Sequence, residues 1–169
     1  MKIFISRSSL LTAIVVVVLL AATPLAIIEI VRTGELYVFS RRFVPDMLAR
    51  LHGPGRLRFV FQPTVAIILG ARDGVKDARL RLPPFLSALI FHGQRRSELL
   101  RGALASVRDL VAVAILLDVV SQLLILRTVH PVAAVILGPV LIGMPYAFAR
   151  AVANRFARWR GYGVSSEAR

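Results

Sequence analysis

Asp118 is the acidic residue whose position most strongly suggests chemistry. It lies near the middle of the apolar stretch 110–126, and Gln122 follows one helical turn later on nearly the same face. A charged side chain there costs about 2.5–3.5 kcal/mol on insertion scales, so it usually has a partner or a function. Two readings stay open. Asp118 and Gln122 form an intramembrane polar site, for ion relay or subunit pairing, or a neutral Asp118 hydrogen-bonds Gln122 within the packing.

The other apolar stretches hold no basic residue at matching depth, so we expect a charged Asp118 to find its partner in another chain, water or a ligand. Glu29 is expected to form an ion pair at the membrane interface, with Arg108 as one candidate. The histidines are isolated, and no metal or haem site is predicted from them: His52, His92 and His130. The chain has no cysteine, which excludes thiolate sites, and we expect no cofactor.

Asp73 and Asp77 lie one helical turn apart within the run 72–79. This run resembles part of the signature of the CDP-alcohol phosphotransferases, a family of lipid-headgroup transferases. Gly70 stands where that signature requires its first Asp, an extra residue changes the later spacing, and the second pair of Asp residues does not follow. We therefore assign no family and expect the two carboxylates either to form salt bridges or to belong to a pattern of charges on the helix surface.

The whole composition points to a membrane protein. The chain has 169 residues, of which 57% are hydrophobic, and carries 22 Lys and Arg against 9 Asp and Glu, for a net charge of +13. A disordered basic chain would lack the apolar residues, and no motif for nucleic-acid binding accompanies the charge. We expect the basic residues to contact the anionic headgroups of a lipid bilayer, with these as candidates: Arg41, Arg42, Arg101 and Arg108.

Three segments are predicted to cross the bilayer. Residues 8–28 carry no charge, and the run is longer than the apolar part of a signal peptide, so we expect an uncleaved anchor. One long helix is expected over 96–126. A turn near 127–131 then leads into a third span over 128–148, with Pro131 at its first helical position. Gly138 and Gly143 are expected to permit close helix contact.

The region between the first two spans is predicted to be helical but not membrane-spanning. Residues 35–53 have one apolar face, and Pro45 favours two short helices that lie on the membrane surface or pack on the protein's own spans. The uncharged runs 59–71 and 82–94 have 13 residues each, which favours re-entrant or interfacial helices.

The charge distribution predicts the threading. Residues 32–101 hold 13 Lys and Arg against 5 acidic residues, and the tail from Arg150 is also basic, whereas the turn near 127–131 holds only Arg127. By the positive-inside rule, the central region and the tail are cytoplasmic and the N-terminus is outside. In an alternative with four spans, residues 59–71 also cross and the N-terminus lies inside.

The sequence thus predicts an all-α integral membrane protein with three transmembrane helices and amphipathic or re-entrant helices on the cytoplasmic side. Its expected parts are an anchor (1–31), a basic interfacial region (32–95), a transmembrane hairpin (96–149) and a basic tail (150–169). We expect a non-catalytic accessory or assembly subunit that contacts other subunits of a bacterial inner-membrane complex. The alternatives are a small oligomeric transporter that uses Asp118, and a lipid enzyme at the membrane interface.

Overall fold

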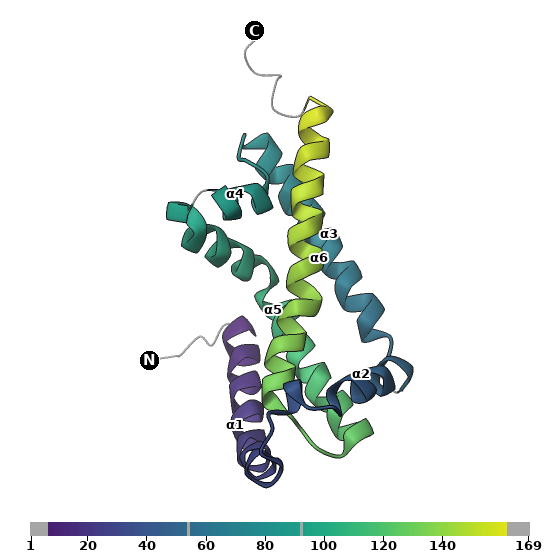
Figure 1. Cartoon of the computed structure of the whole chain (residues 1–169). Coiled ribbons are helices and arrows are strands. Elements are labelled where there is room, and N and C mark those ends of the chain that lie inside the picture. The colour runs from purple at the N-terminus through teal and green to yellow at the C-terminus, as the bar shows by residue number, and fades with distance from the viewer. Residues whose placement is uncertain (1–6, 54, 92, 162–169) are drawn as a thin grey trace. The chain divides into compact units, whose positions relative to one another are not determined.

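The computed structural model describes residues 7–53, 55–91 and 93–161, and within these ranges the chain forms helices and no strands (Figure 1). This confirms the predicted all-helical fold for that part of the chain. His92 and residues 162–169 of the basic tail lie outside the described residues. The elements in chain order are α1 (Arg7–Thr33), the 3₁₀ helix η1 (Tyr37–Phe39), α2 (Phe43–His52), α3 (Arg58–Arg79), α4 (Phe85–Phe91), the 3₁₀ helix η2 (Gly93–Arg95), α5 (Arg96–Leu126) and α6 (Pro131–Trp159).

Three of the described helices are long and apolar enough to cross a membrane. They are Ser8–Thr33 within α1, with 26 residues, α5 with 31 and α6 with 29. At a rise of about 1.5 Å per residue, each exceeds the roughly 30 Å of a hydrocarbon core. The single helix expected over 96–126 is confirmed, and so is the start of α6 at Pro131.

The segment after α1 divides into two short helices, as predicted, although the break does not fall at Pro45. Helix η1 ends at Phe39 and α2 begins at Phe43. Pro45 therefore lies in the first turn of α2. Its missing N–H is tolerated there because the first N–H groups of a helix have no intrahelical partner.

Helix α3 is longer than the uncharged run from which it was predicted. It has 22 residues and continues beyond that run to Arg79, which corresponds to about 33 Å of helix. The second uncharged run contributes only α4, which has 7 residues and begins just after the pair Pro83-Pro84. The predicted re-entrant placement of these segments stays a prediction.

The chain forms two compact units. The first extends to Phe61 and resumes over Asp109–Leu141, and the second comprises Gln62–Arg108 and the chain from Ile142 onward. In the first unit, α1 packs along α5 and the start of α6 through small and branched side chains: Val15, Ala22, Ala112, Ile115, Val119, Val129 and Ala134. A Cβ at Gly138 would lie 2.8 Å from Ile115 Cγ1, which confirms close contact there. Gly143 has no atom within 4 Å of a built Cβ, so its expected contact is not found.

In the second unit, two glycines bring α3 against the backbone of α6. A Cβ at Gly70 would overlap the carbonyl oxygen of Tyr146, and a Cβ at Gly74 would overlap that of Arg150. Both pairs advance by four residues, so the two helices run in the same direction at this contact. Gly70 and Gly74 form a GxxxG pair, the spacing that permits close approach of helices in membranes.

Candidate functional site

Asp118 lies inside the first unit, with only 1% of its surface exposed. The Gln122 side-chain amide donates to Asp118 Oδ2 over 2.6 Å, so the expected contact between these residues is present. The other side of that amide, Oε1, accepts from the His130 backbone N–H over 2.7 Å. Gln122 thereby joins the buried carboxylate to the turn that precedes α6.

Two arginines contact the Asp118 carboxylate, and both belong to the same chain. Arg58 Nη2 lies 2.6 Å from Oδ1, and Arg50 Nη1 lies 3.4 Å from the same oxygen. Arg50 is fully buried and Arg58 is 7% exposed. The expectation that the partner would be another chain, water or a ligand is therefore wrong. That expectation was based on the basic residues within the three predicted spans. Arg50 and Arg58 lie outside those spans, near the end of α2 and at the start of α3.

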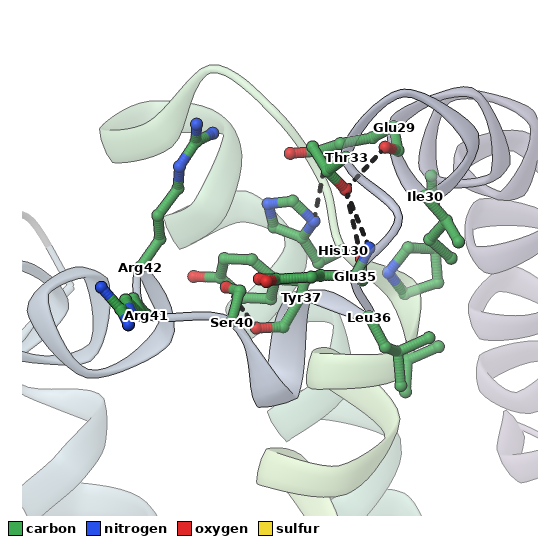
Figure 2. A pocket seen from close by; sticks show the side chains of 13 residues that line it. Glu29, Ile30, Thr33, Glu35, Leu36, Tyr37, Ser40, Arg41, Arg42 and His130 are labelled. Carbon is green, nitrogen blue, oxygen red and sulfur yellow. Dashed lines mark hydrogen bonds and ion pairs between the residues drawn. The ribbon is translucent and has the colours of Figure 1, made fainter.

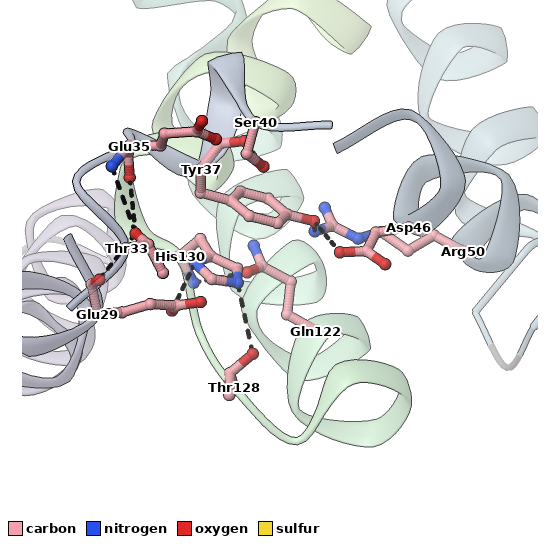
Figure 3. A network of polar contacts seen from close by, with 10 residues as sticks. All are labelled: Glu29, Thr33, Glu35, Tyr37, Ser40, Asp46, Arg50, Gln122, Thr128 and His130. Carbon is pink, nitrogen blue, oxygen red and sulfur yellow. Dashed lines mark hydrogen bonds and ion pairs between the residues drawn. The ribbon is translucent and has the colours of Figure 1, made fainter. Parts of the chain in front are cut away.

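Tyr37 extends the network toward the segment after α1 (Figure 3). Its hydroxyl accepts from Arg50 Nη2 over 3.0 Å and donates to Asp46 Oδ2 over 2.9 Å. Burial raises the pKa of Tyr37 well above the usual value for a phenol, against the opposing positive charge of Arg50. The hydroxyl therefore stays protonated and donates its hydrogen bond to Asp46. Arg50, Arg58, Asp46 and Asp118 together carry no net charge, which suits a buried cluster.

His130 is also part of this network rather than isolated. Its ring stacks on the Tyr37 ring with centroids 3.5 Å apart and planes 4° from parallel. Its Nδ1 lies 3.4 Å from Glu29 Oε2. Burial lowers the pKa of His130, and this outweighs the opposing effect of the Glu29 carboxylate. The ring is therefore neutral near pH 7. The contact between His130 and Glu29 also shows that, within this unit, the end of α1 lies beside the turn between α5 and α6.

A pocket of about 360 Å³ opens beside the Tyr37–His130 stack (Figure 2). The lining comes from the end of α1, the segment through η1 and the start of α6. Its apolar residues include Ala26, Ile30 and Val132, and its charged residues are Glu29, Glu35, Arg41 and Arg42. Two of the four predicted headgroup contacts, Arg41 and Arg42, thus line a pocket. Arg101 and Arg108 are exposed on α5, and lipid contact by all four stays a prediction.

In the second unit, Asp73 and Asp77 bond to side chains of α6. Arg150 Nε and Nη2 contact the two Asp77 oxygens at 2.6 and 3.0 Å, a bidentate ion pair. Tyr146 donates its hydroxyl proton to Asp73 Oδ2 over 2.6 Å and accepts from Arg150 Nη1 over 3.0 Å. The expected salt bridge of Asp77 is confirmed, whereas Asp73 bonds to a phenol. Among the described residues, no three His, Asp or Glu side chains come together as metal ligands would.

Sequence reasoning missed Arg50, Arg58 and Tyr37 as members of the site. One usable signal is that Asp118 lies eight residues before the end of α5 at Leu126. This distance is about 12 Å along the helix, within reach of elements that pack near that end. No protein-family model, curated protein or solved structure matches this chain.

Proposed function

We propose that the chain is a non-catalytic accessory or assembly subunit of a larger protein complex in the bacterial inner membrane. The observation that carries this proposal is that three of its acidic side chains bond to side chains of the same chain. Asp118, Asp73 and Asp77, which would serve an ion path or a metal site, each contact an arginine or tyrosine of the same chain. They act as internal bonds between helices, which fits a scaffold better than a reaction centre.

The apolar surface supports the same proposal. In the apolar stretch of each candidate span, only 17% (α1), 39% (α5) and 28% (α6) of the residues are buried. Large side chains point outward on all three helices, including Leu20 at 65% exposed, Leu124 at 55% and Met144 at 69%. Lipid tails cover such surface in a membrane, and in the proposal a neighbouring subunit covers part of it.

The transport alternative is weakened by the surroundings of Asp118. A relay residue must exchange protons or ions with water on either side of the membrane. Asp118 is 1% exposed, and its carboxylate contacts two guanidinium groups and one amide. The lipid-enzyme alternative is weakened in the same way, because Asp73 and Asp77 bond to Tyr146 and Arg150.

For the threading, we propose the four-span alternative, with both ends of the chain in the cytoplasm. Threading with the N-terminus outside would place Glu29 and His130 on opposite faces of the membrane, and their 3.4 Å contact weighs against that. Helix α3 is not among the three helices that are long and apolar enough to span, so its crossing in this proposal rests on its common direction with α6 at Gly70 and Gly74. The basic residues that this places outside include Arg50 and Arg58, whose charges are paired with Asp118.

A steric test separates a protein neighbour from lipid. Leu20→Trp, Leu124→Trp and Met144→Trp each add bulk to an exposed apolar position, which fluid lipid accommodates and a packed subunit interface does not. The matched controls are Leu20→Ile, Leu124→Ile and Met144→Leu. Each variant is purified from native membranes in mild detergent, and the mass of the complex is measured by native mass spectrometry.

We expect native mass spectrometry to find the unmodified chain in a stoichiometric complex whose mass is well above the 18.5 kDa of the chain itself. At least one of the Trp variants should release it as a monomer, while its control does not. A monomer for the unmodified chain, under conditions that keep other membrane complexes intact, would overturn the proposal.

A further inference from the structure

The pocket at the end of α1 has both an apolar and a charged part. Ala26 and Ile30 belong to the last turns of a candidate membrane span, and Val132 to the first turn of another. The charged residues that line the pocket lie at the end of α1 or beyond it. The volume of about 360 Å³ is near the lower end of the roughly 300–1,000 Å³ found for small-molecule pockets, and with this composition it suits the head of an amphiphile whose chains stay in the bilayer.

The charges of the lining indicate the kind of head. Arg41 and Arg42 contribute two positive charges and Glu29 and Glu35 two negative charges, while His130 is neutral near pH 7. The pocket therefore carries no net charge. A head with only negative charge would leave two carboxylates without a counter-charge, whereas a zwitterionic head would leave none.

The charges are also separated in space. Figure 2 shows Arg41 and Arg42 on one side of the Tyr37–His130 stack and Glu29 on the other. An arginine favours a phosphate because its guanidinium group bonds two phosphate oxygens at once, and both arginines lie on this side of the stack. Glu29, 33% exposed at its side chain, has carboxylate surface available for a cationic donor. A primary ammonium suits it better than a quaternary one because the primary group has N–H donors.

We propose that this pocket binds the phosphoethanolamine headgroup of a membrane phospholipid, with its phosphate on Arg41 and Arg42 and its ammonium on Glu29. The two acyl chains lie along the apolar surface of α1, where Ile27 is 54% exposed. The proposal goes beyond the role as a subunit and does not rest on it, since it requires only that α1 lies in a membrane.

The test is a lipid titration of the purified full chain by native mass spectrometry. The lipids are dioleoyl phosphatidylethanolamine, phosphatidylglycerol and phosphatidylcholine, and soluble glycerophosphoethanolamine is titrated in parallel. The variant Arg41→Gln/Arg42→Gln is compared with Arg56→Gln/Arg127→Gln, which removes the same charge from two exposed arginines outside the pocket. Circular dichroism confirms that each variant is folded.

We expect phosphatidylethanolamine to bind tightest, and the pocket double variant to lose roughly tenfold in affinity for it, as for the loss of charged hydrogen bonds. The control double variant should bind as the unmodified chain does. Glu29→Gln should remove the preference for phosphatidylethanolamine over phosphatidylglycerol. Equal binding of the three lipids, equal loss in both double variants, or equally tight binding of the soluble headgroup would overturn the proposal. None of these outcomes depends on whether a partner subunit exists.

Discussion

Arg58 Nη2 lies 2.6 Å from Asp118 Oδ1, and this contact joins the start of α3 to the interior of α5. Both side chains are almost fully buried. The pair gives Asp118 a counter-charge from the same chain, so the acid in this apolar helix is explained by the fold. Removing one partner of such a pair lowers the stability of the fold more than replacing the whole pair by apolar residues, because the remaining charge stays buried without a partner.

The variant Asp118→Asn should lower the free energy of unfolding by about 3–5 kcal/mol, since it leaves Arg50 and Arg58 buried without their shared carboxylate. Unfolding in mixed detergent micelles, followed by circular dichroism, measures the change. The triple variant Arg50→Met/Arg58→Met/Asp118→Leu should recover most of the loss. Arg56→Leu, at an exposed arginine two residues from Arg58, should stay within about 0.5 kcal/mol of the unmodified chain. A triple variant as unstable as Asp118→Asn would contradict the unpaired charge as the cause.

Asp118 should not carry protons across the membrane. We expect proteoliposomes that contain the unmodified chain to show the same proton flux as empty liposomes, because the carboxylate is already bonded to two guanidinium groups. The measurement is the decay of an imposed pH gradient, read with an entrapped dye. A flux above the empty liposomes that disappears in the folded triple variant would restore the transport alternative.

Gly70→Ala should destabilise the contact between α3 and α6. The added Cβ would overlap a backbone carbonyl, which cannot move aside as a flexible side chain can. We expect a loss of about 1–3 kcal/mol, the usual range for overpacking, measured by thermal unfolding in detergent. Gly102→Ala is the matched control, because nothing lies within 4 Å of its built Cβ. In a helix interior that change should be stabilising by up to about 1 kcal/mol. Equal behaviour of the two variants would be inconsistent with close packing at Gly70.

The fold should lose stability in mild acid because of His130. Its pKa is lowered in the folded chain, so the unfolded chain binds a proton first as the pH falls below the ordinary histidine value of about 6.5. Stability from this group is therefore complete above that pH and declines below it. The groups that face the ring are Glu29 on α1, Tyr37 on η1, and Asp46 and Arg50 on α2.

Melting temperatures between pH 5 and 8 test this effect. His130→Gln should flatten the profile between pH 5 and 7, whereas His52→Gln, at an exposed position of α2, should leave it unchanged. A slope that persists in His130→Gln would assign the effect to other groups, with the carboxylate of Glu29 as the first to examine.

Reporter fusions test the threading. In the four-span arrangement, a fusion at Gly53 reports the outside of the cell, and a fusion after Arg160 reports the cytoplasm. Alkaline phosphatase and green fluorescent protein provide opposite readouts for each position. A cytoplasmic signal at Gly53 would contradict the four-span arrangement and favour three spans with the N-terminus outside.

The long helices could be predicted from the sequence because each depends on local features. The uncharged run before Glu29 and the position of Pro131 fix two candidate spans, and the continuous pattern over 96–126 fixes the third. The extent of α3 was harder to predict because its second half is charged, and two of its charged residues, Asp73 and Asp77, find their partners on α6.

The polar network could be predicted only in part. Gln122 follows Asp118 by one turn, so their contact depends on the helix alone. Arg50 is 68 positions away from Asp118, and their contact depends on how the segment after α1 folds back along α5. The pair Gly70 and Gly74 was different, since its GxxxG spacing was present in the sequence and was a usable signal for helix contact.

The Arg50–Arg58–Asp118 cluster also has a consequence for synthesis of the chain. The ribosome makes both arginines well before it makes Asp118, so the nascent protein carries two guanidinium groups whose counter-charge has not yet been translated. We expect that a chain arrested before α5 holds α2 and α3 only loosely and is open to membrane proteases. Arrival of α5 then supplies the carboxylate that completes the cluster.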